Sequence, residues 1–212
     1  MIRDGIRPPK FADKFAHLDF EADPMPVISL YPIPESADLG SLVLTLCGLD
    51  CQPRASRWSE CADIPRVRMR APIICSIFNW SEVVEWEGVR LCDYLDAVGL
   101  AVPPEGYLAF SSRDGHYFET LPASMARDPR TLLVTGLNGQ PLAQEYGGPL
   151  RLVVPFLQGY KSVKWLGAIR VFQHDPAGIK RLLGQSKTGL LGLAWRERYG
   201  IEQPAGADGR PV

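Results

Sequence analysis

The sequence predicts an α+β domain built from mixed β-sheets and short helices. Apolar runs of strand length recur along the chain, and turn signals separate them. Glycine and proline are abundant, with 20 and 19 residues among 212, which favours many turns over a helical bundle. Strands do not alternate regularly with long helical patterns, so βαβ units are not expected. With 46% hydrophobic residues, the chain has enough apolar side chains to bury a sizeable core.

The chain is predicted to form one domain with an extension at each end. Residues 1–40 are rich in proline and mixed charge and lack periodicity, so we expect an extended arm on the surface. Residues 41–200 carry the strand and helix patterns, and residues 201–212 are expected to be a loose tail. No internal repeat or linker divides the central part.

The first half of the domain contains one strand and one helix with clear patterns. Ser41–Leu46 reads as a strand. Residues 50–72 are polar and irregular, apart from alternating arginines that indicate one face of an edge strand (Arg66, Arg68 and Arg70). Val89–Val98 has apolar side chains at the i, i+3, i+4, i+7 spacing of an amphipathic helix, and Gly99 follows as a C-terminal cap.

The second half is dominated by strands that end at turn dipeptides. Asp114-Gly115 is a hairpin signal between two short strands, and Asn138-Gly139 follows a third. The loop Gln158–Lys164 separates the last two strands. The predicted strands are Tyr107–Ser111, Tyr117–Leu121, Leu132–Leu137, Leu150–Val154 and Leu166–Phe172.

Two short helices are predicted near the C-terminus. Asp175 followed by proline is a typical helix start, with an N-cap and then proline at the first helical position. A helix over Pro176–Leu183 should follow. A second helix over Ala194–Tyr199 should end at Gly200.

The overall composition excludes some classes of partner. The net charge is −1, with both signs spread along the chain, so nothing attracts the protein to nucleic acid or to an anionic membrane. No run of about 18 apolar residues could span a bilayer. The N-terminus lacks the apolar core of a secretory signal, so we expect a cytoplasmic protein.

The five cysteines do not suggest a disulfide framework, because the count is odd and the chain has no export signal. A zinc cluster of Cys47, Cys51 and Cys61 is an alternative. Against it, no CxxC pair occurs and the histidines lie far away in sequence. Small buried thiols are the simpler interpretation for Cys47 and Cys92.

Cys75 is the candidate metal ligand, because it precedes Trp80 and Trp86 in an unusual loop. A thiolate suits a soft or thiophilic metal. Neighbouring groups that could donate hydrogen bonds to its sulfur are Ser76, Asn79 and Ser81. The alternative is a buried free thiol beside core aromatic residues.

Two further segments could hold a polar ligand. Ser111 to Gly115 places hydroxyls at a strand end before a turn, although turn chemistry alone explains such a pattern. The run from Gly147 to Trp165 places Arg151 on a strand and follows it with a glycine-led loop carrying two lysines and a serine. Cations, a hydroxyl and backbone amides together suit a phosphate, although a solvated basic loop is the competing interpretation.

Spaced motifs in this region resemble those of the sulfite oxidase family of molybdopterin-dependent oxidoreductases. They are Asn138-Gly-Gln-Pro-Leu142, Gly147-Gly-Pro-Leu-Arg151 and Gly159-Tyr-Lys-Ser-Val-Lys-Trp165, in the family's order. The resemblance extends upstream to Cys75 and covers roughly residues 40–200. It implies the sulfite-oxidase-type molybdopterin-binding fold and a molybdenum–molybdopterin cofactor, with Cys75 as the protein ligand of the metal.

The resemblance also implies roles for other residues. The predicted cofactor-binding residues are Ser112, Tyr146, Arg151, Lys161, Ser162, Val163 and Lys164. An oxo-anion substrate would need cations near the metal, and Arg113 and Arg70 are the candidates for that role. The chain departs from the family where Ile74 replaces an arginine before the ligand cysteine, and in a longer spacing from Cys75 to the next tryptophan. The alternating arginines could supply the missing charge.

The implied reaction is a two-electron oxygen-atom transfer on a small oxo-anion or sulfoxide-type substrate. No haem or flavin domain accompanies the motifs, so a separate electron-transfer partner such as a cytochrome is expected. The alternative is a catalytically silent module of the same fold that binds or carries molybdopterin.

Overall fold

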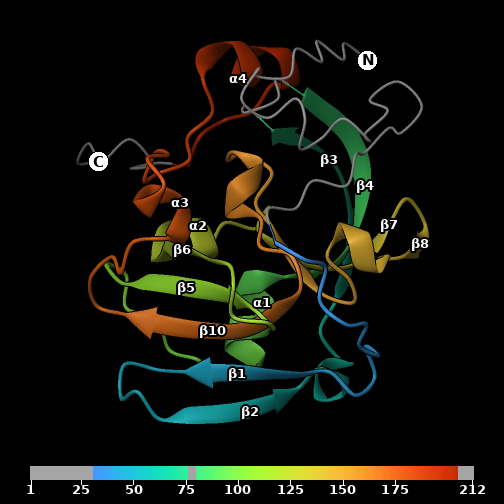
Figure 1. The fold of residues 1–212 in the computed structure, drawn as a ribbon, viewed down its shortest axis with the longest axis vertical. Helices are drawn as coiled ribbons and strands as arrows, with labels where there is room; N and C mark the ends of the chain where they lie inside the picture. Colours follow the sequence, from blue (N-terminus) through green and yellow to red (C-terminus); the bar gives the residue numbers. More distant parts are fainter. Residues whose placement is uncertain (1–30, 76–79, 205–212) are drawn as a thin grey trace.

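The computed structural model describes residues 31–75 and 80–204. The strands form two sheets (Figure 1). The first sheet has the order β2-β1-β10-β5-β6, with β1 and β10 parallel and the other pairs antiparallel. Its strands are β1 (Val43–Cys47), β2 (Pro53–Arg57), β5 (Tyr107–Ser112), β6 (Phe118–Pro122) and β10 (Leu166–Phe172).

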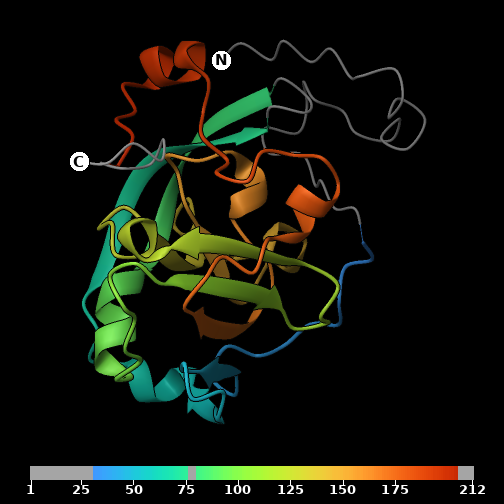
Figure 2. The ribbon, with the colours of Figure 1, turned by 90° about the vertical axis from the view of Figure 1, so that its left-hand side faces the viewer.

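The second sheet is antiparallel and contains a long two-stranded ribbon. Its order is β3-β4-β7-β8, and β9 also pairs with β7. Figure 2 shows β3 and β4 running together along one side of the molecule. The strands are β3 (Arg66–Cys75), β4 (Trp80–Arg90), β7 (Leu132–Leu137), β8 (Gln140–Pro141) and β9 (Arg151–Val153).

The helices are short, and the last two follow the final strand β10 in sequence. They are α1 (Leu91–Ala97), α2 (Ala123–Ala126), α3 (Ile179–Leu182) and α4 (Leu193–Tyr199), with 3-10 turns η2 (Trp58–Cys61), η3 (Gln144–Tyr146) and η4 (Gly159–Lys161). Among the described residues, no helix is long and apolar enough to cross a bilayer.

Two apolar clusters hold the fold together. The first is larger and includes Leu44 of β1, Tyr94 of α1 and Ile169 of β10, each fully buried. The second is smaller and covers one face of the second sheet, with Trp80 and Trp86 of β4 at its centre. Burial of apolar side chains of this size stabilises a fold by about 1.5–3 kcal/mol each. Both clusters therefore help to hold the two sheets in place.

Most predicted elements are confirmed, which makes the predicted α+β class with mixed sheets correct. The predicted hairpin strands on either side of Asp114-Gly115 pair with each other, and the alternating arginines lie on β3, an edge strand. Asn138 and Gly139 both have positive φ and connect β7 to β8, as the dipeptide predicts.

Three expectations about elements were wrong. The segment predicted as a loop after Cys75 is largely the eleven-residue strand β4, which also takes Val89 from the predicted helix. Strand β2 lies in the segment expected to be irregular. The helix expected at Pro176 begins only at Ile179, because the Asp175 carboxylate accepts a hydrogen bond from the Ala177 N–H and Ala177 has φ of 61°, which continues a turn.

The arm and the tail are only partly described. Residues 31–42 contain no helix or strand and run across the molecule ahead of β1, as an extended arm would (Figure 1). Residues 1–30, residues 205–212 and the predicted hydrogen-bond donors Ser76 and Asn79 lie outside the described residues.

Candidate functional site

Cys75 is the last residue of β3 and lies opposite Trp80, the first residue of β4. Directly opposed residues in an antiparallel pair point to the same face of the sheet. Cys75 is half-buried and packs against the second apolar cluster, which contains Trp80. The thiol therefore lies at the end of the ribbon, on the apolar face of the second sheet.

The turn η4 lies directly against Cys75's strand because Gly159 has no side chain. A Cβ atom at Gly159 would come within 2.7 Å of the Ile74 carbonyl oxygen. Only glycine fits this close approach. The contact brings the segment that ends in Lys164 close to Cys75, the residue that follows Ile74.

Arg151 on β9 is a buried cation without a carboxylate partner among the described residues. Its side chain is 1% exposed. Its guanidinium donates to the Tyr146 carbonyl at 2.7 Å and the Ser162 carbonyl at 3.3 Å, and it lies 5.2 Å from the centre of the Trp86 ring. Its Nε has no acceptor in the described part of the chain. Burial lowers the pKa of Arg151 to about 10. A buried charge is costly unless it is compensated, so this position suits an anionic ligand.

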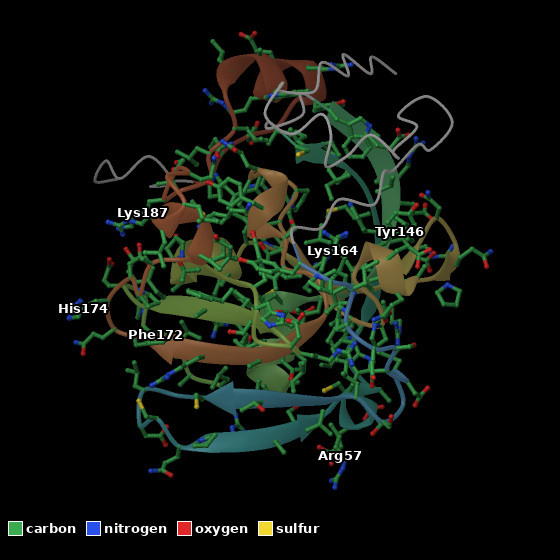
Figure 3. The ribbon with its side chains drawn as sticks, in the orientation of Figure 1. Arg57, Tyr146, Lys164, Phe172, His174 and Lys187 are labelled. Carbon is green, nitrogen blue, oxygen red and sulfur yellow. The ribbon has the colours of Figure 1, made fainter. Side chains whose placement is uncertain are left out.

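Lys164 brings a second cation to the same place. Its Nζ donates to the Glu145 carbonyl at 2.9 Å. Gly147, with φ of 104°, allows the close packing, since a Cβ atom there would lie 2.9 Å from the Lys164 side chain. Figure 3 shows Lys164 near Tyr146, which precedes Gly147 in the chain. Burial, followed by the charge of Arg151, lowers the pKa of Lys164 to about 7. Two cations that repel each other in this way favour a bound anion.

The low pKa of Lys164 should affect the stability of the cofactor-free chain. Between pH 7 and roughly 10.4, the usual lysine value, the unfolded chain binds more protons than the folded chain, so stability should rise with pH. Lys164→Met should flatten this rise. It should also raise the melting temperature at pH 6, by roughly 2–4 °C for each kcal/mol of relief. Thermal unfolding from pH 6 to 10 measures both effects.

The matched control is Lys187→Met. Lys187 is exposed and pairs with Asp175 at 2.9 Å, away from Lys164 (Figure 3). Its loss should leave the slope between pH 7 and 10 unchanged. A slope in the Lys164→Met chain as steep as in the unsubstituted chain would contradict the prediction.

Ser162 and Val163 bind the neighbouring strand. The Ser162 hydroxyl accepts a hydrogen bond from the Val154 N–H at 3.0 Å, and the Val163 carbonyl accepts one from the Leu152 N–H at 2.8 Å. Val163 is fully buried. These bonds hold the backbone between η4 and Lys164 against β9, so both residues belong to the frame of the candidate anion site.

Lys161 has a different place from the one predicted for it. Its side chain is 2% exposed, and its Nζ lies 2.8 Å from Glu119 Oε2 and donates to the Thr120 carbonyl at 3.1 Å. The other Glu119 oxygen accepts from the Lys180 N–H at 2.8 Å. The ammonium of Lys161 is therefore committed to β6, and we leave Lys161 out of the proposed cofactor contacts.

Ser112 ends β5, Arg113 follows it, and Arg113 contacts two other segments of the chain. The Arg113 N–H donates to the Trp165 carbonyl at 2.7 Å. Its guanidinium donates to the Glu35 carbonyl at 2.9 Å, so it holds the arm. The Ser112 hydroxyl donates to Asp114. Burial raises the pKa of Asp114, but hydrogen bonds from Ser112 and His116 outweigh this effect and lower it.

The arginines of β3 do not supply charge beside Cys75. They are exposed, and alternation along the strand places them on the face opposite to Cys75. Arg68 pairs with Glu87 at 3.3 Å, and Arg66 donates to Thr135 at 2.8 Å. The expectation that Arg70 and its neighbours replace a missing cation was therefore wrong. Ser81, a predicted donor to the sulfur, bonds Tyr199 instead at 2.5 Å.

Sequence reasoning missed two features of the site. Glu119 gave one signal, a single acidic residue in an otherwise uncharged strand, but nothing in the sequence identified its partner. Trp80 and Trp86 were noted only as neighbours of Cys75, although both carry buried indole nitrogens without acceptors in the described residues.

Among the described residues, no three histidine, cysteine or acidic side chains could hold a metal together, so the zinc cluster finds no support.

The arrangement matches known proteins at the level of family and fold. The family model for the oxidoreductase molybdopterin binding domain matches residues 31–180. An uncharacterized oxidoreductase, YuiH of Bacillus subtilis, is 30% identical over 72% of this chain and 76% of its own length. The protein-methionine-sulfoxide reductase catalytic subunit MsrP of Gluconobacter oxydans is 29% identical over 70% of this chain, which spans only 50% of that relative.

Among solved structures, the sulfane dehydrogenase SoxCD from Paracoccus pantotrophus has a similar fold. It aligns with a TM-score of 0.58 and 22% identity, over 67% of this chain and 41% of that one. Together with the family match, this likeness confirms the predicted molybdopterin-binding fold.

Proposed function

This chain belongs to the oxidoreductase molybdopterin-binding domain family, and from this premise we propose that it transfers oxygen atoms at a molybdenum held by Cys75. Family membership confirms the predicted resemblance, the molybdenum–molybdopterin cofactor and the oxidoreductase class. The substrate class, a small oxo-anion or a sulfoxide, is part of the proposal.

The observation that carries the proposal is the buried Arg151 guanidinium. It is 1% exposed, and its hydrogen bonds to the described residues go to the Tyr146 and Ser162 carbonyls. Arg151 stands opposite Val134, which lies on the same face of the second sheet as Cys75. An anionic cofactor with a phosphate would compensate its charge. Lys164 adds a second cation, and Gly159 brings this segment against β3. The residues present therefore fit a phosphate-bearing cofactor whose metal is bound by a thiolate.

Each part of the site has a proposed role. The Cys75 thiolate would bind the metal, and Arg151 with Lys164 would hold the phosphate. When bound, the cofactor supplies the two-electron redox chemistry. Arg113 would orient an anionic substrate oxygen, provided that its guanidinium exchanges the Glu35 carbonyl for the substrate. The second apolar cluster excludes water from the Cys75 side of the sheet.

Metal analysis tests the proposal. The chain should carry a single molybdenum after expression in a host that makes the cofactor. The loaded protein should reduce a sulfoxide to the sulfide with electrons from a reduced dye, or oxidise sulfite to sulfate with an oxidised dye as electron acceptor. Zinc, or no metal, would contradict the proposal. Molybdenum without turnover of any such substrate would favour a carrier of the cofactor. A separate redox partner and a cytoplasmic location stay predictions.

Arg151→Met should reduce molybdenum retention during dialysis by roughly 10- to 100-fold. This range corresponds to the loss of one or two hydrogen bonds between the charged guanidinium and the cofactor. The variant should still fold, because it removes a buried charge that has no carboxylate partner among the described residues, and with it the cost of burying that charge. Circular dichroism of the unloaded variant checks the fold. Arg151→Lys is the matched control: it keeps the charge and should retain more metal than methionine does. Equal retention in all three chains would exclude an anion-binding role for Arg151.

A further inference from the structure

Trp80 carries a buried hydrogen-bond donor that the described chain does not satisfy. Its side chain is 2% exposed, and its Nε1 finds no acceptor in residues 31–75 and 80–204. A buried donor left without a partner costs about 1–3 kcal/mol, and most buried polar groups in native proteins are paired. The position of this indole therefore needs an explanation.

The fold satisfies another buried indole. Trp165 Nε1 donates to the Gln144 carbonyl at 2.6 Å, although Trp165 is 4% exposed and similarly enclosed. Burial alone therefore does not leave an indole of this fold without an acceptor. Trp80 is left without one at the end of β4, next to the candidate metal ligand.

The register of the ribbon places Trp80 beside Cys75. The two residues are direct partners across β3 and β4, with side chains on the same face. Opposed Cβ atoms in such pairs lie about 4.5–5.5 Å apart, and an indole extends well beyond its Cβ. Trp86 Nε1 also has no acceptor among the described residues, but its ring lies under the Arg151 guanidinium, six residues further along β4. Trp80 is the one of the two that stands opposite Cys75 in the ribbon.

We propose that the Trp80 indole N–H donates a hydrogen bond to an oxygen or sulfur acceptor of the group that Cys75 holds. The inference rests on the proposed function, since it assumes a ligand at Cys75. An indole is a neutral, fixed donor with no acceptor atom of its own. It would position an oxo group or a substrate oxygen at the metal without adding charge, and would thereby favour ligands with an exposed oxygen. Trp80 is then a positioning residue of the active site.

Nitrogen-15 labelling of tryptophan tests this directly. The five tryptophans give five indole signals, and Trp80→Phe identifies the one that belongs to Trp80. When the chain is loaded with molybdenum cofactor, the Trp80 indole proton should move downfield and exchange with solvent roughly tenfold more slowly, as a net hydrogen bond of ordinary strength gives. The signal of Trp58, which stacks on Tyr94 in the first cluster, should stay in place.

The two sources of an acceptor are separated by adding sulfite to the loaded protein. A shift on loading identifies the cofactor as the acceptor, and a shift that appears only with sulfite identifies the substrate oxygen. A Trp80 signal that moves in neither case, in protein shown to contain molybdenum, overturns this inference and leaves the proposed function standing. Absence of molybdenum in the unsubstituted chain would instead overturn the proposed function.

A second readout covers the case in which Trp80→Phe alters folding. The variant should bind molybdenum at most about 10- to 100-fold more weakly, the usual cost of removing a group that supports a metal ligand, so a loaded fraction of it can still be measured. Its molybdenum(V) resonance should shift relative to the unsubstituted protein. Trp58→Phe removes an indole from the distant first cluster and should leave the resonance unchanged. Identical resonances in all three proteins would also overturn the inference.

Discussion

Replacing Cys75 by serine is expected to abolish oxygen-atom transfer and the molybdenum(V) resonance. A serine hydroxyl is a harder and far less acidic group than a thiol, so it binds a thiophilic metal poorly. Loss of a residue that merely supports a ligand costs about 10- to 100-fold in metal affinity or activity, and loss of the ligand itself should exceed that range. Turnover with a dye-linked assay and metal analysis on the same sample measure the effect.

Cys92→Ser is the matched control for this experiment. Cys92 is also half-buried and not in a disulfide, but it lies on α1, where its thiol donates to Asp93 at 3.4 Å. Its replacement should leave metal content and turnover unchanged. A Cys75→Ser protein that retains the resonance would show that the thiol at the end of β3 is an ordinary buried cysteine.

Lys161→Met is expected to destabilise the fold by about 3–5 kcal/mol, the usual cost of leaving one partner of a buried ion pair uncompensated. The two partners are 2% and 1% exposed, and the pair ties η4 to β6. Since η4 also packs on the end of β3, its displacement should loosen the Cys75 side of the site. Urea unfolding of the cofactor-free protein measures the loss of stability.

The double variant Lys161→Met with Glu119→Leu separates the ion pair from the packing. Removing both charges leaves no uncompensated group, so most of the lost stability should return. Arg127→Met is a control for a surface pair: Arg127 binds Asp96 at 2.7 Å with both side chains exposed, and its loss should cost at most about 1 kcal/mol. A Lys161→Met protein as stable as the Arg127→Met protein would contradict the assignment.

Local patterns predicted much of the fold. The strands Leu132–Leu137 and Leu166–Phe172 have the bounds that the sequence indicates. The two turn dipeptides close the β5–β6 and β7–β8 hairpins. The long strand β4 was missed, because its tryptophans and acidic residues do not give a simple alternation before Val89. Its pairing with β3 over ten residues outweighs the weak local signal.

By itself the sequence determined the family, the cofactor class and the identity of the cysteine proposed as ligand, because these depend on residue types at fixed spacing. Only the tertiary structure decided which charges are available. Lys161 and Lys164 look equivalent in sequence, yet Lys161 is neutralised by Glu119, 42 residues away, while Lys164 lies beside Arg151. The alternation of side chains along β3 places Arg70 on the face opposite to Cys75, and the pairing of β3 with β4 places Trp80 opposite Cys75 on the same face. Burial and charge compensation depend on long-range contacts, which a local pattern does not contain.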